Sequence, residues 1–104
     1  MDQHAFTLYI AGGSELADRA VANFKRFVAT RLNGAYDLTI IDVIKEPRRA
    51  RQARVVATPL LVRHSPAPLV KILGDLSEEA KVLTQLGLTL LPDASQDGDP
   101  LRRS

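Results

Sequence analysis

Apolar and polar residues alternate in blocks along the chain, and the blocks predict a regular succession of strands and helices. Aromatic and β-branched residues predict a strand over residues 6–11. Apolar residues at helical spacing then predict a helix that begins after Ser14 and ends at Asn33-Gly34. The later blocks predict a strand over 36–44, a helix over 47–54, strands over 55–62 and 69–73, and a helix over 78–88. The predicted order is β-α-β-α-β-β-α.

The first predicted helix has a cap and a buried stripe. Ser14 has the side chain of an N-cap residue, and positive charge near the other end suits the helix dipole. The apolar positions that predict the stripe are Leu16, Ala20, Phe24, Phe27, Val28 and Leu32. The strand over 36–44 is apolar on both faces, which is typical of a strand buried under helices. Because a helix separates the first two strands, we expect them to be parallel.

Prolines lie at the boundaries of the predicted strands in the second half of the chain. Pro59 opens the first of the two later strand runs, and a Thr58-Pro59 bond at such a point can be cis. The two runs flank His64-Ser65 and predict an antiparallel hairpin, while Gly74-Asp75 predicts a turn before the last helix. In that helix, the residues expected to face inward are Ala80, Val82, Leu83 and Leu86.

Length and composition limit the functional classes. The chain of 104 residues has the size of one domain, predicted over 1–91, followed by a polar tail over 92–104 that we expect to be disordered. Cysteine is absent, which excludes disulfides, thiol redox chemistry and thiolate metal sites. We expect neither a membrane span nor a signal peptide, so a cytoplasmic location is predicted.

The residues offer little catalytic chemistry. His4 and His64 are the only histidines, and neither stands at metal-ligand spacing from other donors, so we expect no metal and no cofactor. Gly12-Gly13 is too short for a phosphate-binding loop, and no nucleophile has a recognisable base. Asp42 is either a functional buried acid or, more simply, a hydrogen-bonded carboxylate at a strand end. Tyr9 is either an exposed contact or a half-buried strand residue.

Positive charge is concentrated in one short segment. Lys45 is followed there by four arginines at positions 48, 49, 51 and 54, and the predicted helix has few large apolar side chains. Such a segment can bind phosphate or nucleic acid, but the aromatic side chains that single-strand binders use are scarce. Two interpretations remain, a solvated helix face or a contact surface for an acidic protein.

The element order is that of the thioredoxin-like fold, and Thr58-Pro59 lies where that fold keeps a cis-proline. Residues 11–15 stand where thioredoxins carry Cys-x-x-Cys, but they contain no cysteine. Within that fold the chain resembles the KaiB family of circadian clock proteins. The resemblance rests on short matches over residues 8–12, 19–20, 41–43, 57–60 and 71–77, with Tyr36, Pro47, Pro66 and Pro68 between them and 81–83 after them.

The resemblance implies a non-enzymatic regulator that binds a KaiC-type ATPase, and in full clocks also KaiA-like proteins and sensor histidine kinases. From the residues themselves, we expect no nucleic acid and no membrane as a binding partner. Arg19, Arg54, Arg63 and Lys71 stand at positions that are basic in relatives. The predicted partner-binding residues are therefore Arg19, Arg48, Arg49, Arg51, Arg54, Arg63 and Lys71. Two alternatives are a KaiB-fold adaptor in stress or signalling and a thioredoxin-fold enzyme.

The family is also metamorphic, with a tetrameric ground state whose C-terminal half is folded differently. We therefore expect self-association as a dimer or tetramer, and slow exchange of residues 56–88 between two folds. The residues predicted to govern the switch are Pro59, Pro66, Pro68, Gln85 and Gly87. Gln85 and Gly87 replace a glycine and an aspartate that the family more often shows, so they are predicted to favour one resting fold.

Overall fold

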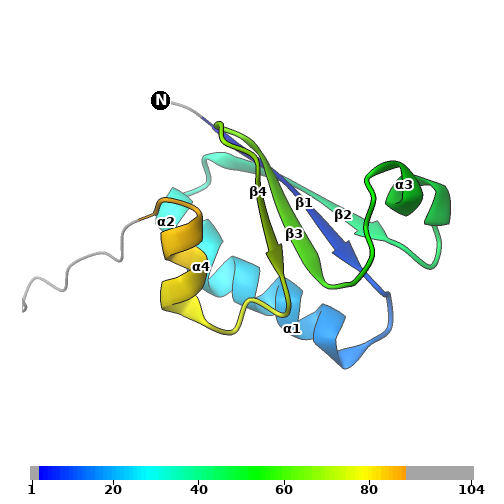
Figure 1. Ribbon diagram of the computed structural model, residues 1–104. Coiled ribbons are helices and arrows are strands. Elements are labelled where there is room, and N and C mark those ends of the chain that lie inside the picture. Colours follow the sequence, from blue (N-terminus) through cyan, green and yellow to red (C-terminus); the bar gives the residue numbers. More distant parts are fainter. Residues whose placement is uncertain (1–2, 89–104) are drawn as a thin grey trace, which may run out of the picture.

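The computed structural model describes residues 3–88, and the predicted domain limit at residue 91 and the tail over 92–104 lie outside this range. One sheet has helices on both faces (Figure 1). The strands are β1 (His4–Ile10), β2 (Tyr36–Asp42), β3 (Leu60–Ser65) and β4 (Val70–Leu73). The helices are α1 (Glu15–Asn23), continued by the π-helical η1 (Phe24–Ala29) and by α2 (Thr30–Leu32), then α3 (Pro47–Gln52) and α4 (Glu79–Gln85).

The sheet has the strand order β2-β1-β3-β4. β1 is parallel to β2, with Leu8 opposite Ile40, and antiparallel to β3, with Leu8 opposite Leu61. β4 is antiparallel to β3 and forms one edge, while β2 forms the other. The predicted element order, parallel unit and hairpin are confirmed, and the arrangement is thioredoxin-like.

The first helix begins and ends where its signals predict. Ser14 Oγ accepts a hydrogen bond from the Ala17 N–H at 3.0 Å, and Asn33 ends the helix with φ 50°. The buried stripe contains Ala17 rather than Leu16, whose exposed fraction is 45%. That part of the prediction is wrong because Ala17, Ala20 and Phe24 are spaced three and four residues apart and turn Leu16 outward.

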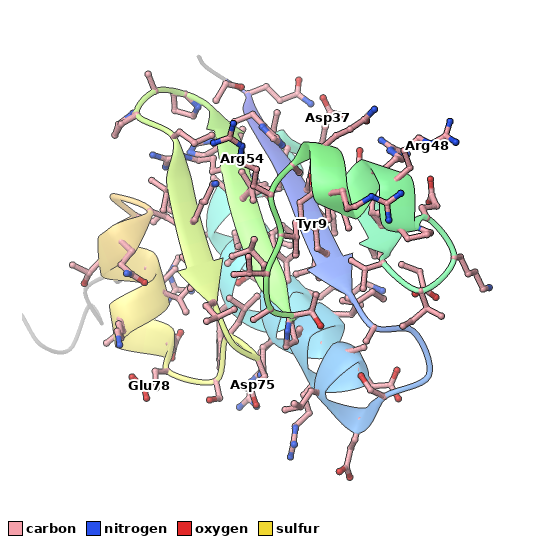
Figure 2. All side chains as sticks on the ribbon, turned by 45° about the vertical axis from the view of Figure 1, so that its right-hand side comes forward. Tyr9, Asp37, Arg48, Arg54, Asp75 and Glu78 are labelled. Carbon is pink, nitrogen blue, oxygen red and sulfur yellow. The ribbon has the colours of Figure 1, made fainter. Side chains whose placement is uncertain are left out.

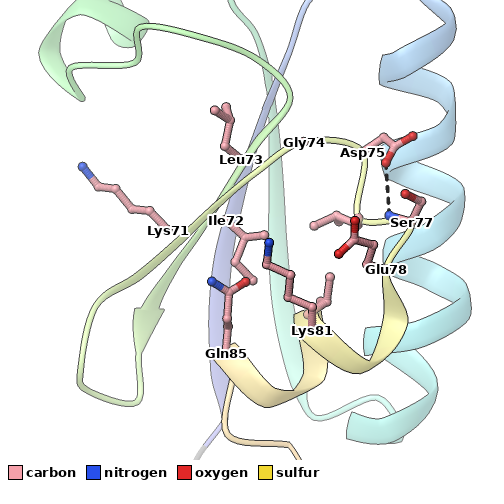
Figure 3. A pocket seen from close by; sticks show the side chains of 11 residues that line it. Lys71, Ile72, Leu73, Gly74, Asp75, Ser77, Glu78, Lys81 and Gln85 are labelled. Atoms are coloured by element: carbon pink, nitrogen blue, oxygen red, sulfur yellow. Dashed lines mark hydrogen bonds between the residues drawn. The ribbon is translucent and has the colours of Figure 1, made fainter.

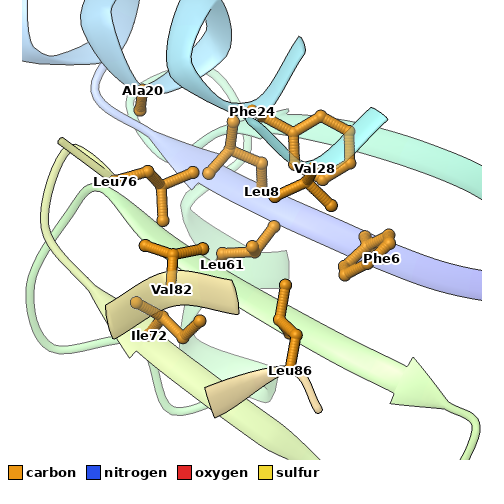
Figure 4. Close-up of a cluster of buried hydrophobic side chains, with 10 residues drawn as sticks. All are labelled: Phe6, Leu8, Ala20, Phe24, Val28, Leu61, Ile72, Leu76, Val82 and Leu86. Carbon is orange, nitrogen blue, oxygen red and sulfur yellow. The ribbon is translucent and has the colours of Figure 1, made fainter. Parts of the chain in front are cut away.

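Two apolar cores of unequal size lie on the two faces of the sheet. The larger one lies between the sheet and the helices α1, η1 and α4, and Figure 4 shows its ten buried side chains. At its centre Phe24 contacts Phe6 and Tyr36 edge to face, with ring centroids 5.1 and 5.5 Å apart. The smaller core lies under α3 and contains Tyr9, Ile41, Leu60 and Val62.

Two strand predictions are corrected. The strand expected to be buried on both faces is the edge strand β2, which ends at Asp42 and exposes 44% of Ile40. The many apolar residues of β2 do not bury it on both faces. The short helix α3 covers one face only in part, and α1 with η1 covers the other face only in part. β3 begins at Leu60 instead of residue 55, because residues 54–59 carry the chain from α3 back to the centre of the sheet.

The link and hairpin contain three cis bonds, at Thr58-Pro59, Ser65-Pro66 and Ala67-Pro68. The first of them is the one that the sequence singles out. In α4, Val82 and Leu83 are buried as predicted and Leu86 is buried just beyond its end, whereas Ala80 is exposed. The helix ends in a Schellman motif: Gly87 has φ 71°, its N–H donates to Thr84, and the Leu88 N–H donates to Leu83.

Candidate partner-binding surface

Within residues 3–88, α3 is the one helix on its face of the sheet, opposite α1 and α4 (Figure 1). Pro47 occupies its first turn, where a missing N–H costs nothing. Ala50 is the helix's only buried residue among those described, and Ala53 and Val55 after it help to cover the smaller core. Tyr9 is buried there, with an exposed fraction of 6%, so it is a packed strand residue rather than an exposed contact.

The arginines of this segment are exposed, and most of them lack a carboxylate neighbour. Arg49 pairs with Glu46 at 3.2 Å. In residues 3–88, no carboxylate oxygen lies within 4.0 Å of Arg48, Arg51 or Arg54. Figure 2 shows Arg48 and Arg54 on this side of the molecule, together with α3. We call Arg48, Arg49, Arg51 and Arg54 the α3 basic surface.

Two exposed apolar side chains flank the α3 basic surface in the chain. Ile44 precedes α3 and has an exposed fraction of 69%, and Val56 follows it with 97%. Arginine is enriched in protein interfaces, and apolar side chains contribute to their cores. The combination suits contact with a protein better than contact with a small anion.

The other predicted contact residues are placed separately. Lys71 is exposed on β4 opposite Val62, so its side chain lies on the same face of the sheet as α3. Arg19 lies on α1 and its Nε is 3.6 Å from Asp75 Oδ2. Hydrogen bonding from Ser77, together with the charge of Arg19, holds the pKa of the Asp75 carboxyl below its usual value.

Arg63 is the exception among the predicted contact residues, because its exposed fraction is only 5%. Its Nη1 donates to the carbonyl oxygen of Leu86 at 2.5 Å, and its Nη2 donates to that of Pro68 at 3.3 Å. In this fold the guanidinium therefore joins β3 to the end of α4 and to the link before β4. Its side chain is not part of an exposed basic surface.

Asp42 joins the loop after β1 to the link before α3. Its Oδ1 accepts hydrogen bonds from the N–H groups of Gly12 at 3.1 Å and Ile44 at 2.9 Å. These two bonds, the Gly12 bond foremost, hold the pKa of the Asp42 carboxyl below its usual value. A Cβ on residue 12 would overlap this carboxylate, which explains the glycine. Asp42 is thus the hydrogen-bonded carboxylate at a strand end.

Removing the Asp42 carboxylate should weaken the fold more at neutral pH than in acid. Because its pKa is lower in the folded chain, its contribution is present above the unfolded pKa of about 3.9 and is lost as pH falls through the folded value. We expect Asp42→Ala to lower urea stability at about pH 7 and to make less difference at about pH 2. Asp37→Ala, at an exposed position of the same strand, is the control. Equal losses at both pH values would contradict the expectation.

No group of three or more metal-binding side chains occurs within residues 3–88. The same part of the chain contains no helix long and apolar enough to cross a membrane. His64 instead makes a cross-strand contact, with its Nε2 2.8 Å from Thr7 Oγ1.

Comparisons with known proteins identify a sequence family for this chain. The sequence model of the KaiB domain matches residues 7–88. Circadian clock protein KaiB3 of Synechocystis is 38% identical over 96 residues, covering 92% of each chain, and a Synechococcus elongatus circadian clock oscillator protein KaiB is 40% identical over 92 residues, covering 88% of each.

Solved structures show the same fold. The N-terminal domain of Synechococcus elongatus SasA has a TM-score of 0.67 at 22% identity, covering 83% of this chain and 81% of that domain. The Drosophila melanogaster thioredoxin Deadhead has a TM-score of 0.64 at 16% identity, covering 83% of this chain and 80% of its own. These similarities show a thioredoxin-like fold, and the family match over most of the chain shows that the protein belongs to the KaiB family of circadian clock proteins.

Proposed function

We propose that this protein is a non-enzymatic clock regulator that binds a KaiC-type ATPase through the α3 basic surface. The observation that carries the proposal is the group of three arginines, Arg48, Arg51 and Arg54, without a carboxylate neighbour among the described residues. Arg48 and Arg51 are on α3, which contributes little to the core, and Arg54 follows that helix. The exposed apolar residues Ile44 and Val56 flank the segment in the chain. The proposed role in a clock is based on the similarity to KaiB clock proteins.

Charge on this surface should act mainly on the rate of association. Exposed charges attract an oppositely charged surface over about a Debye length, which is about 8 Å at physiological ionic strength. Substitution of such charges typically changes the association rate and its salt dependence more than the dissociation rate. An acidic region on the ATPase is therefore part of the proposal.

The test is a charge reversal at Arg51 and Arg54, measured as association kinetics with a purified KaiC-type ATPase. We expect Arg51→Glu with Arg54→Glu to slow association about tenfold at low salt, and the difference to shrink as ionic strength rises. Both side chains are exposed, so the fold should be unaffected.

The matched control is Lys25→Glu with Arg26→Glu, which makes the same change of charge in the helix layer on the opposite face of the sheet. This control should bind nearly as fast as the wild-type protein. Equal slowing of the two double variants would show that only net charge matters, and it would contradict the α3 basic surface as the contact. Absence of binding by the wild-type protein would contradict the ATPase as its partner.

A further inference from the structure

The edge strand β4 borders a groove whose other wall is α4. The cavity measures about 370 Å³ and is lined by residues 71–78 together with Lys81, Val82 and Gln85. In Figure 3, Ile72 points toward Lys81 and Gln85, whereas Lys71 and Leu73 point away from them. The groove therefore lies next to the exposed edge of β4, on the face of the sheet that α4 covers.

The backbone groups that face outward from this edge follow from the strand register. The Gly74 N–H donates to the Pro59 carbonyl at 2.8 Å, which makes Pro59 and Gly74 a hydrogen-bonded pair. Such pairs alternate along an antiparallel ladder. Ile72 opposite Leu61 and Val70 opposite Arg63 are the next ones. The N–H and C=O groups of Lys71 and Leu73 therefore point away from β3 and are available to another strand.

The side chains along the same edge are unusually apolar for an exposed strand. Leu69 and Leu73 have exposed fractions of 58% and 63%, and Lys71 stands between them. Open edges invite pairing with another chain, and charged side chains such as lysine are a common protection. One lysine leaves this edge weakly protected.

The edge is complementary to itself in one antiparallel register. If Ile72 lies opposite its own copy, Lys71 of each chain lies opposite Leu73 of the other. Both outward-facing residues then form hydrogen-bonded pairs, and the two lysines do not oppose each other. Ile72 is buried in the larger core of each copy, and in this register it lies on the α4 face of the joined sheet at the two-fold axis.

Charges on α4 are also compatible with a two-fold arrangement. Glu78 and Lys81 line the groove, and within residues 3–88 neither has an oppositely charged group within 4.0 Å. A two-fold axis at Ile72 places the two α4 helices antiparallel on the same face of the joined sheet, each with Glu78 and Lys81 in its groove. Contacts of residue i with j and of j with i are what a two-fold interface requires.

We propose that β4 pairs with β4 of a second copy of this chain, joining two four-stranded sheets into one. The self-complementary register, the exposed leucines and the unpaired charges all favour a second copy over an unrelated peptide. The pairing surface is short, so the dimer is weak and forms at high concentration. The proposal concerns the edge opposite β2 and does not depend on the α3 basic surface.

The test compares Leu73→Glu with Leu73→Lys by sedimentation equilibrium from about 10 µM to about 1 mM protein. In the proposed register, a carboxylate at position 73 faces Lys71 of the second copy, and an ammonium there is repelled by it. We expect the dimer of Leu73→Glu to be at least about tenfold tighter than that of Leu73→Lys. The reason is that the two cross-strand contacts between positions 71 and 73 are attractive in the first variant and repulsive in the second. Leu73 is exposed, so both variants should fold.

The control repeats both substitutions at Leu16, an exposed leucine on α1. This pair changes the net charge equally and should differ little in self-association. In the wild-type protein, amide exchange of Lys71 and Leu73 should slow with concentration, whereas Ile72 should be protected throughout. A monomeric mass of the wild-type protein over the whole concentration range would overturn the proposal. So would a difference in dimer affinity between the Glu and Lys variants at Leu16 that is as large as the difference at Leu73.

Discussion

Replacement of Arg63 by methionine is expected to destabilise the fold by about 2–3 kcal/mol. Methionine fills a similar apolar volume but cannot donate the hydrogen bonds that Arg63 gives to the carbonyls of Leu86 and Pro68. An unsatisfied buried carbonyl costs about 1–3 kcal/mol, and loss of the desolvated charge offsets part of that cost. The end of α4 and the link before β4 should loosen first.

The measurement is urea unfolding followed by circular dichroism. Lys71→Met makes the same change of residue type at an exposed position on the neighbouring strand and should cost less than about 0.5 kcal/mol. Wild-type stability in Arg63→Met would show that the two contacts contribute nothing. Because Arg63 is buried, a loss of ATPase binding after its substitution is informative only when the variant is still folded.

Gln85→Gly combined with Gly87→Asp is expected to cost the described fold about 2 kcal/mol. Gln85 is in the last turn of α4, where glycine lowers helix stability by up to about 1 kcal/mol. Gly87 has φ 71° in the Schellman motif, a conformation that an aspartate adopts only at a cost. Both natural residues suit the local geometry of this fold, and their role in selecting the resting fold stays a prediction.

This double variant also tests our proposal that residues 56–88 can adopt a second fold. If that fold lies within a few kcal/mol, destabilising the first one should populate it and produce a second set of NMR resonances. Gln85→Ala, which keeps a good helix former, is the control and should show one set. A double variant that shows only folded and unfolded signals would contradict the second fold while leaving the stability estimate intact.

Local signals in the sequence predict most of the fold. Ser14 and Asn33-Gly34 mark the ends of the first helix because capping and left-handed turns depend on few residues. The misplaced features depend on tertiary contacts. β2 looks buried on both faces but forms an edge, since strand order is not encoded in its own residues. The late start of β3 reflects the path that the chain needs to return from α3.

The candidate site could be predicted only in part. Clustering along the chain identifies the α3 basic surface because its residues share one short helix and the link after it. Arg63 is among the predicted contact residues because relatives are basic at that position, whereas alternation along β3 places its side chain on the same face as the buried Leu61. The link between Gly12 and Asp42 spans thirty positions and leaves no local signal.

The shallow attachment of α3 has an evolutionary consequence. Since Ala50 is the one residue of α3 that is buried within the described fold, the side chains around it can be exchanged with little effect on folding. Sequence drift there changes surface chemistry almost independently of stability, whereas drift in β1 or α1 is restrained by the core. A few substitutions in this single helix could therefore change the preferred binding partner of the protein from one lineage to another.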